Sequence, residues 1–119
     1  MYSRPLPLSL KPLRFLGSSL DDLRNFPRVV KHAAGIELMR VQAGVEPANF
    51  KPLREVGDGA YEIRLRLAGA WRVIYVARFD DAIYVLHAFQ KKTQKTAPRD
   101  IKRAAARYRT LLKRSEAER

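Results

Sequence analysis

The sequence predicts a small α+β domain: an antiparallel sheet of four to five strands, two helices near the N-terminus and one C-terminal helix. Three closely spaced runs rich in β-branched and aromatic residues lie between residues 61 and 89, and amphipathic helical patterns flank them. A length of 119 residues and a hydrophobic content of 46% correspond to one domain with one core. We therefore expect a flexible leader over 1–9, a single domain over 10–115 and a tail over 116–119.

The first half of the chain is expected to contribute one strand and two helices. Residues 10–16 alternate apolar and polar side chains and contain a proline, which favours a strand near a sheet edge. Ser18 or Ser19 can cap a short helix. The first turn of this helix holds two aspartates, whose carboxylates interact favourably with the helix dipole. Pro27 fits the first turn of a longer helix that runs to about Ala43 with apolar residues at helical spacing.

The second half is expected to form most of the sheet and the last helix. The predicted strands cover 52–56, 61–67, 71–79 and 82–89. We place hairpin turns at Gly69 and at Asp80–Asp81. Pro98 begins a helix with a regular apolar stripe, so this helix should pack on one face of the sheet.

The chain is strongly basic, with 24 Lys and Arg against 12 Asp and Glu. The excess is uneven, because residues 61–119 carry 15 basic and 6 acidic side chains. A positive field concentrated on one half suits a polyanion such as a nucleic acid. An acidic protein partner or a plain solvated surface would also fit this charge.

Several classes of protein are disfavoured by what the sequence lacks. It has no cysteine, so it has no disulfide, thiolate metal site or thiol nucleophile. No run approaches the roughly 18–20 apolar residues of a membrane span, and the N-terminus does not resemble a signal peptide. The sequence also lacks a Gly-rich phosphate-binding loop, a cluster of metal ligands and the Gly-x-Ser-x-Gly motif of serine hydrolases. We expect a cytoplasmic protein with no membrane association, no cofactor and no metal.

Cations gather on one face of the predicted hairpins. A turn centred at Gly69 places Arg66 opposite Arg72, with Arg64 one step along. Directly opposed like charges destabilise a sheet, and an anionic ligand would offset that repulsion. The alternative is that these arginines spread into solvent. Because Arg72 faces away from the apolar side of Trp71, we also expect its side chain to be dispensable for folding.

The end of the last strand adds to this cationic face. A turn at residues 80–81 places His87 on the Arg72 face, and Lys91 follows just beyond the strand. The segment 89–96 holds three lysines, two threonines and two glutamines, all able to hydrogen-bond phosphates or base edges. Beside the arginines this segment could form one electropositive cleft, and the alternative is a solvated loop.

Four blocks of the sequence carry a family resemblance, which spans about residues 10–113. The blocks are Phe15-Leu16-Gly17-Ser18-Ser19-Leu20-Asp21-Asp22-Leu23, Tyr61-Glu62-Ile63-Arg64-Leu65, Trp71-Arg72-Val73-Ile74-Tyr75-Val76 and His87-Ala88-Phe89-Gln90-Lys91-Lys92-Thr93-Gln94-Lys95-Thr96-Ala97-Pro98. With these blocks the chain resembles the RelE/ParE superfamily of type II toxins, and more closely its phage-derived, HigB-like branch.

This resemblance implies a RelE-like domain that is the toxin of a type II toxin-antitoxin system. It implies a metal-independent endoribonuclease, an mRNA interferase that cleaves translated mRNA, usually on the ribosome, by attack of the 2′-hydroxyl. It also implies a cognate antitoxin, commonly with a helix-turn-helix domain. The alternative is a ParE-like chain that inhibits DNA gyrase without being an enzyme, and a third possibility is a toxin remnant.

The catalytic residues that we expect are Arg64, Arg72, Lys91 and Lys92. Arginines can clamp a phosphate with two hydrogen bonds, and a lysine crowded by cations can have a lowered pKa and act as base or acid. Strand alternation places only one lysine in the site, and our register favours Lys91. His87 is an alternative proton carrier. The expected RNA-binding residues are Lys51, Arg66, His87, Thr93, Gln94 and Lys95.

Overall fold

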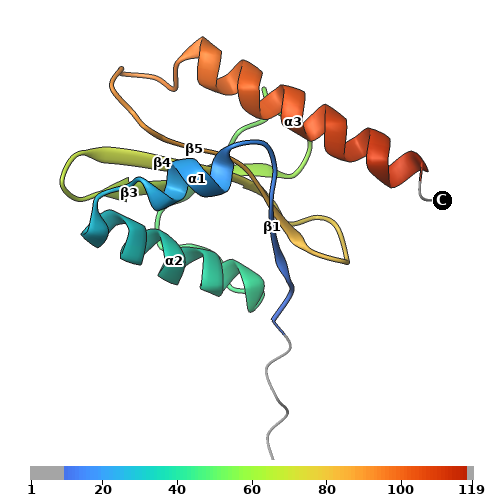
Figure 1. The fold of residues 1–119 in the computed structure, drawn as a ribbon, viewed down its shortest axis with the longest axis horizontal. Helices are drawn as coiled ribbons and strands as arrows, with labels where there is room; N and C mark the ends of the chain where they lie inside the picture. Colours follow the sequence, from blue (N-terminus) through green and yellow to red (C-terminus); the bar gives the residue numbers. More distant parts are fainter. Residues whose placement is uncertain (1–9, 118–119) are drawn as a thin grey trace, which may run out of the picture.

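A computed structural model describes residues 10–117 and shows a five-stranded sheet with α2 and α3 on opposite faces (Figure 1). The elements are β1 (Leu13–Phe15), α1 (Ser19–Arg24), α2 (Arg28–Gln42), β2 (Phe50–Pro52), β3 (Ala60–Arg66), β4 (Ala70–Val76), β5 (Ile83–Gln90) and α3 (Pro98–Ala117). The leader predicted for 1–9 lies outside the described residues, and α3 extends into the tail predicted for 116–119. None of the described helices is long and apolar enough to cross a membrane.

The sheet has the strand order β1-β5-β4-β3-β2, which confirms the predicted α+β class. One detail of the prediction is wrong, because β1 runs parallel to β5 while the other pairs are antiparallel. A tight turn enforces an antiparallel pair, but more than sixty residues separate these two strands. Backbone hydrogen bonds from Ile83 to Pro12 (2.9 Å) and from Leu16 to Val85 (3.0 Å) extend the parallel pairing.

The strand predicted for 52–56 is also wrong, because the strand lies earlier, at Phe50–Pro52. Lys51 is the register partner of Glu62 in β3. After Pro52 the chain turns, with the Val56 N–H donating to the Leu53 carbonyl at 3.1 Å. The apolar pattern at Leu53 and Val56 reflects their burial in the core beneath α3, and neither residue lies in a strand.

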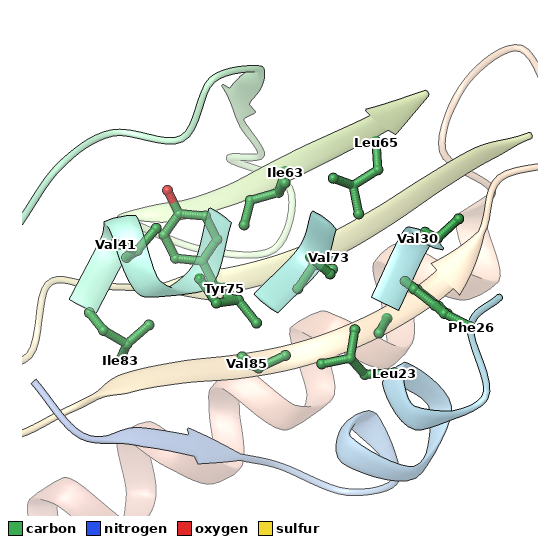
Figure 2. Packing of buried hydrophobic residues seen from close by; sticks show 13 residues of the cluster. Leu23, Phe26, Val30, Val41, Ile63, Leu65, Val73, Tyr75, Ile83 and Val85 are labelled. Carbon is green, nitrogen blue, oxygen red and sulfur yellow. The ribbon is translucent and has the colours of Figure 1, made fainter. Parts of the chain in front are cut away.

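Two hydrophobic clusters form, one on each face of the sheet. Strand alternation sends Ile63, Val73 and Tyr75 towards α2, where they pack with its buried residues and with α1 (Figure 2). Ile74 and Val76 of β4 point the other way and pack with residues of α3. Both faces of the central strand β4 are therefore covered.

The β3–β4 hairpin turns at residues 67–69, with positive φ at Ala68 (52°) and Gly69 (111°). The register places Arg64 opposite Arg72 and Arg66 opposite Ala70, so the predicted pairing of Arg66 with Arg72 is wrong by two residues. A shift of two leaves every side chain on its expected face. In β5 an irregularity at Leu86 follows Val85. His87 then shares the Arg72 face, as predicted, and so does Phe89.

Two glycine substitutions should change stability in opposite directions. A Cβ at Gly57 would overlap the ring of the buried Tyr108, so we expect Gly57→Ala to cost about 1–3 kcal/mol of the free energy of unfolding. Gly35 lies in α2, and no atom lies within 4 Å of the place that an alanine methyl group would take, so Gly35→Ala should add about 0.5–1 kcal/mol. Urea unfolding of both variants measures this. A Gly57→Ala variant as stable as the parent would show that the ring can move aside.

Candidate functional site

Five cationic side chains come together on the side of the sheet that faces α3, and we call them the cationic cluster. They are Lys51, Arg64, Arg66, Arg72 and Lys91. Arg72 interacts electrostatically with Arg64 and Arg66, and Lys91 interacts with Arg72, Arg64 and Lys51. Strand register explains the gathering, because these residues come from neighbouring positions of β2, β3, β4 and the end of β5.

Within residues 10–117, one carboxylate, that of Glu62, forms ion pairs with these cations. Its side chain is fully buried, and its Oε1 lies 3.6 Å from Arg72 Nε and 3.9 Å from Lys51 Nζ. Its Oε2 accepts a 2.6 Å hydrogen bond from Thr96 Oγ1. A buried charge is tolerated only when it is paired and hydrogen-bonded. Glu62 therefore fixes the centre of the cluster.

The segment between β5 and α3 reaches across the sheet to this carboxylate. Thr96 is 7% exposed and belongs to this segment, whereas Glu62 lies two strands away in β3. The Lys91 ammonium donates to the carbonyls of Thr93 (2.8 Å) and Gln94, which closes the segment on itself. The Thr96 hydroxyl is thus engaged by Glu62.

Arg72 is the most deeply buried cation of the cluster, at 2% exposure. Burial lowers the pKa of Arg72, the Glu62 charge opposes this effect, and Arg64 adds to it. Its Nη1 donates to the Trp71 carbonyl at 2.9 Å. The sequence predicts that Arg72 is dispensable for folding, but its burial beside Glu62 contradicts the premise of that prediction. We therefore expect its removal to destabilise the fold, because the buried Glu62 carboxylate would lose its main counter-ion.

Lys91 is half-exposed, and its backbone N–H extends the β4–β5 ladder by donating to the Ala70 carbonyl at 2.8 Å. Desolvation lowers the pKa of Lys91, and the positive charge of Arg72 lowers it further against the opposing effect of Glu62. A lysine with a lowered pKa is better matched to proton transfer near neutral pH. The direction of this shift is compatible with proton transfer by Lys91, which stays a prediction.

His87 lies apart from the cationic cluster. Its side chain is buried, and its Nε2 lies 2.8 Å from Asp100 Oδ1 in the first turn of α3. Burial lowers the pKa of His87, and the hydrogen bond with Asp100 opposes this. His87 also stacks on Phe89, with ring centroids 4.7 Å apart. These contacts connect it to α3 rather than to the arginines.

Four buried side-chain atoms make no hydrogen bond within residues 10–117. They are Glu62 Oε1, Arg64 Nε, Arg72 Nε and His87 Nδ1. Three of the four belong to Glu62 and the cationic cluster, so the cluster is not saturated by its own hydrogen bonds. No group of three or more His, Cys, Asp or Glu side chains within the same residues could hold a metal ion.

Residues 21–109 match the family described as phage-derived protein Gp49-like (DUF891). The chain belongs to this family. A double arginine-to-alanine mutant of the E. coli toxin RelE, solved in the free state, matches this Gp49-like domain with a TM-score of 0.58 and 22% identity. The alignment covers 79% of this chain and 97% of the RelE chain, and it shows a shared fold. No curated protein matches the sequence significantly.

These findings confirm the predicted RelE-like fold and the phage-derived family of the chain. The closer HigB-like assignment stays a prediction. The site residues also stay predictions, and the structure shows where each of them lies.

The structure brings together half of the ten predicted site residues. Lys51, Arg64, Arg66, Arg72 and Lys91 form the cationic cluster. Lys92, Thr93, Gln94 and Lys95 are exposed on the segment after β5, and His87 lies under α3. For the side chains of Lys92, Gln94 and Lys95 the described part of the chain shows no hydrogen bond or ion pair with the cluster.

Sequence reasoning missed Glu62 and Asp100. Glu62 alternates in step with Arg64 and Arg66, so its place on the cationic face was visible in the sequence. Its burial was not, because that depends on the segment carrying Thr96. From the sequence, Asp100 is an acidic residue in the first turn of a helix. Its contact with His87 follows from the packing of α3 on β5, which the sequence does not show.

Neutralising Glu62 should destabilise the domain much more than neutralising an exposed acid. We expect Glu62→Gln to cost about 3–5 kcal/mol of the free energy of unfolding, because Arg72 would then be a buried charge with no counter-ion. The matched control Glu55→Gln changes an exposed carboxylate and should stay within about 0.5 kcal/mol of the parent. Urea unfolding at pH 7 measures both. Equal free energies of unfolding for the two variants would show that Arg72 does not need the Glu62 carboxylate.

Proposed function

We propose that this Gp49-like domain is the HigB-like toxin of a type II toxin-antitoxin system and acts in the cytoplasm as a metal-independent endoribonuclease on translated mRNA. The observation that carries the proposal is the cationic cluster, in which buried Arg72 lies opposite Arg64 and beside Lys91. Five cations surround one carboxylate, so the cluster suits a phosphate. The shared fold with a protein named as the toxin RelE supports the same assignment.

The reaction uses the RNA, this cluster and a water molecule, which carries the proton that Lys91 does not carry. The 2′-oxygen attacks the adjacent phosphorus and the P–O5′ bond breaks, which leaves a 2′,3′-cyclic phosphate and a 5′-hydroxyl. Arg64 and Arg72 stabilise the negative charge that develops on the phosphate oxygens, because guanidinium groups remain charged at every working pH. Lys91, with its lowered pKa, carries one of the two protons that move.

Two partners accompany this activity. The ribosome presents translated mRNA to the cationic face, where Arg66 and Lys51 contact the RNA backbone beside the reacting phosphate. The exposed Lys92, Thr93, Gln94 and Lys95 extend that contact along the segment after β5. A cognate antitoxin with a helix-turn-helix domain covers the toxin when it is not active.

Cell-free translation tests the activity directly. We expect the purified chain to introduce new mRNA 5′ ends inside translated codons, detected by primer extension, and to do so in the presence of a metal chelator that spares ribosomal magnesium. The Arg64→Ala variant is the control: because Arg64 is only partly buried, we expect this variant to fold and to produce no new ends. Intact mRNA together with trapped gyrase–DNA complexes would contradict the proposal and support a gyrase inhibitor.

The two lysines at the strand end should differ in their tolerance of arginine. Lys91→Arg keeps the charge but loses a titratable amine, so we expect single-turnover cleavage to fall about 10²–10⁴-fold. Lys92→Arg is the matched comparison, and cleavage should stay at the parental rate because Lys92 is exposed and needs only its charge. If both variants cleave at the parental rate, Lys91 transfers no proton.

Association with the antitoxin should depend steeply on salt. The excess of basic residues over 61–119 would steer an acidic contacting segment and accelerate its encounter with the toxin. We expect the association rate constant to fall strongly between about 50 and 500 mM salt, because the screening length shortens over this range. Stopped-flow mixing measures it. A flat profile would indicate a mainly apolar interface.

A further inference from the structure

A pocket of about 510 Å³ lies between α1, the outer edge of β5 and the first turn of α3. The aromatic rings of Phe26, Trp71 and Phe89 line it, together with the arginines Arg99 and Arg103. The cleavage chemistry proposed above uses none of these five residues. The pocket has the size and the mixed apolar and polar lining of a small-ligand site.

Two aromatic rings are held in place at this pocket by buried neighbours. Trp71 is partly exposed and packs against the buried Phe26, with ring centroids 4.8 Å apart at an angle of 52°. Phe89 is partly exposed and stacks on the buried His87 at 4.7 Å and 21°. The pocket therefore offers fixed aromatic surfaces, which lose little conformational entropy when a planar ring stacks on them.

The wall between these rings is an open sheet edge. Within residues 10–117, β1 pairs with β5 only as far as Val85. The Lys91 N–H points to β4, so alternation along the ladder directs the N–H and C=O groups of Ala88 and Gln90 outwards, to the pocket. Paired donors and acceptors of this kind match the hydrogen-bonding edge of a nucleobase.

Charge adds a second kind of recognition. Arg99 and Arg103 are exposed at the rim, while the carboxylate of Asp100 is held by His87 and that of Asp22 accepts a 2.7 Å hydrogen bond from Ser18. The two acids are thus engaged, and the two arginines have no ion pair within the described residues. The His87 Nδ1, buried at the pocket wall, also makes no hydrogen bond there.

We propose that this pocket binds one unpaired nucleotide of the RNA strand whose phosphate lies on the cationic cluster. The base stacks on Phe89 or Trp71, and Arg99 and Arg103 bind its phosphate. Phe89 connects the two places, because it is the register partner of Arg72 and strands lie only about 5 Å apart. This inference rests on the proposed function for the identity of the strand, but its test does not require cleavage.

An extended peptide that adds a strand to β5 fits the same pocket less well. Only Ala88 and Gln90 offer outward-facing backbone groups, whereas peptides that extend a sheet pair along several residues. Flat rings and arginines are instead the features that bind single-stranded nucleic acid.

The single tryptophan of the chain provides the measurement, because Trp71 lines the pocket. We expect ribonucleoside 5′-monophosphates and short unstructured trinucleotides to change its fluorescence saturably in the full chain. Ribose 5-phosphate, inorganic phosphate and poly-glutamate should leave it unchanged at the same concentrations. These three probes carry the anionic charge without a base.

Two variants and one control locate the binding. Phe89→Leu removes a stacking surface and Arg103→Gln removes a rim charge, and each should weaken nucleotide binding about tenfold. Lys102→Gln removes an equal charge from an exposed neighbouring position of α3 outside the pocket and should have no effect. Arg103 is exposed, so its variant is expected to fold even if Phe89→Leu does not.

Three results would overturn the inference. One is a response to phosphate or poly-glutamate equal to that of nucleotides, which would indicate an anion site or a peptide site. Another is binding of mononucleotides without trinucleotides, which would indicate a free-nucleotide site. The last is equal affinity of Arg103→Gln and Lys102→Gln. Cleavage of mRNA without any nucleotide response would refute this pocket alone, and a nucleotide response without cleavage would refute only the proposed activity.

Discussion

The buried ion pair between Glu62 and Arg72 is the constraint on which the rest of the site depends. Placing Arg64 directly opposite Arg72 brings like charges together at the centre of a sheet, which is unfavourable in the absence of a counter-ion. Glu62 provides that counter-ion from the same face, at 3.6 Å. Neither group could be buried alone, so the presence of each one explains the burial of the other.

The same pair connects the order of the segment after β5 to the order of the sheet. Thr96 donates to Glu62 across β4, and Lys91 holds the start of the segment by donating to two of its carbonyls. From there the chain enters α3, whose first turn contacts His87 through Asp100. The stretch from β5 to the first turn of α3 thus supplies Lys91 to the cationic cluster, forms the connecting segment and lines part of the pocket, so a change in Glu62 is expected to affect all three.

Most of the fold was predictable because it follows from local pattern. Alternation assigned the faces of β3 to β5, and helical spacing located α2 and α3. The register was not predictable to the residue, since a turn centred at Ala68 or at Gly69 gives the same faces and moves the partner of Arg72 by two positions. The parallel β1 and the burial of Glu62 depend on contacts between distant parts of the chain, which no local pattern records.

Charge balance explains why a site of this kind can remain stable and still bind an anion. One carboxylate faces five cations, enough to permit the burial of Arg72 but too little to neutralise the cluster. A second acid on this face would compete with phosphate for the arginines. Glu62, Arg64 and Arg72 accordingly each keep a buried side-chain atom that makes no hydrogen bond within the described chain. Because the buried pair is neutral, the residual positive charge lies on the partly exposed Lys51, Arg64 and Lys91 and on the exposed Arg66, where an anion can reach it.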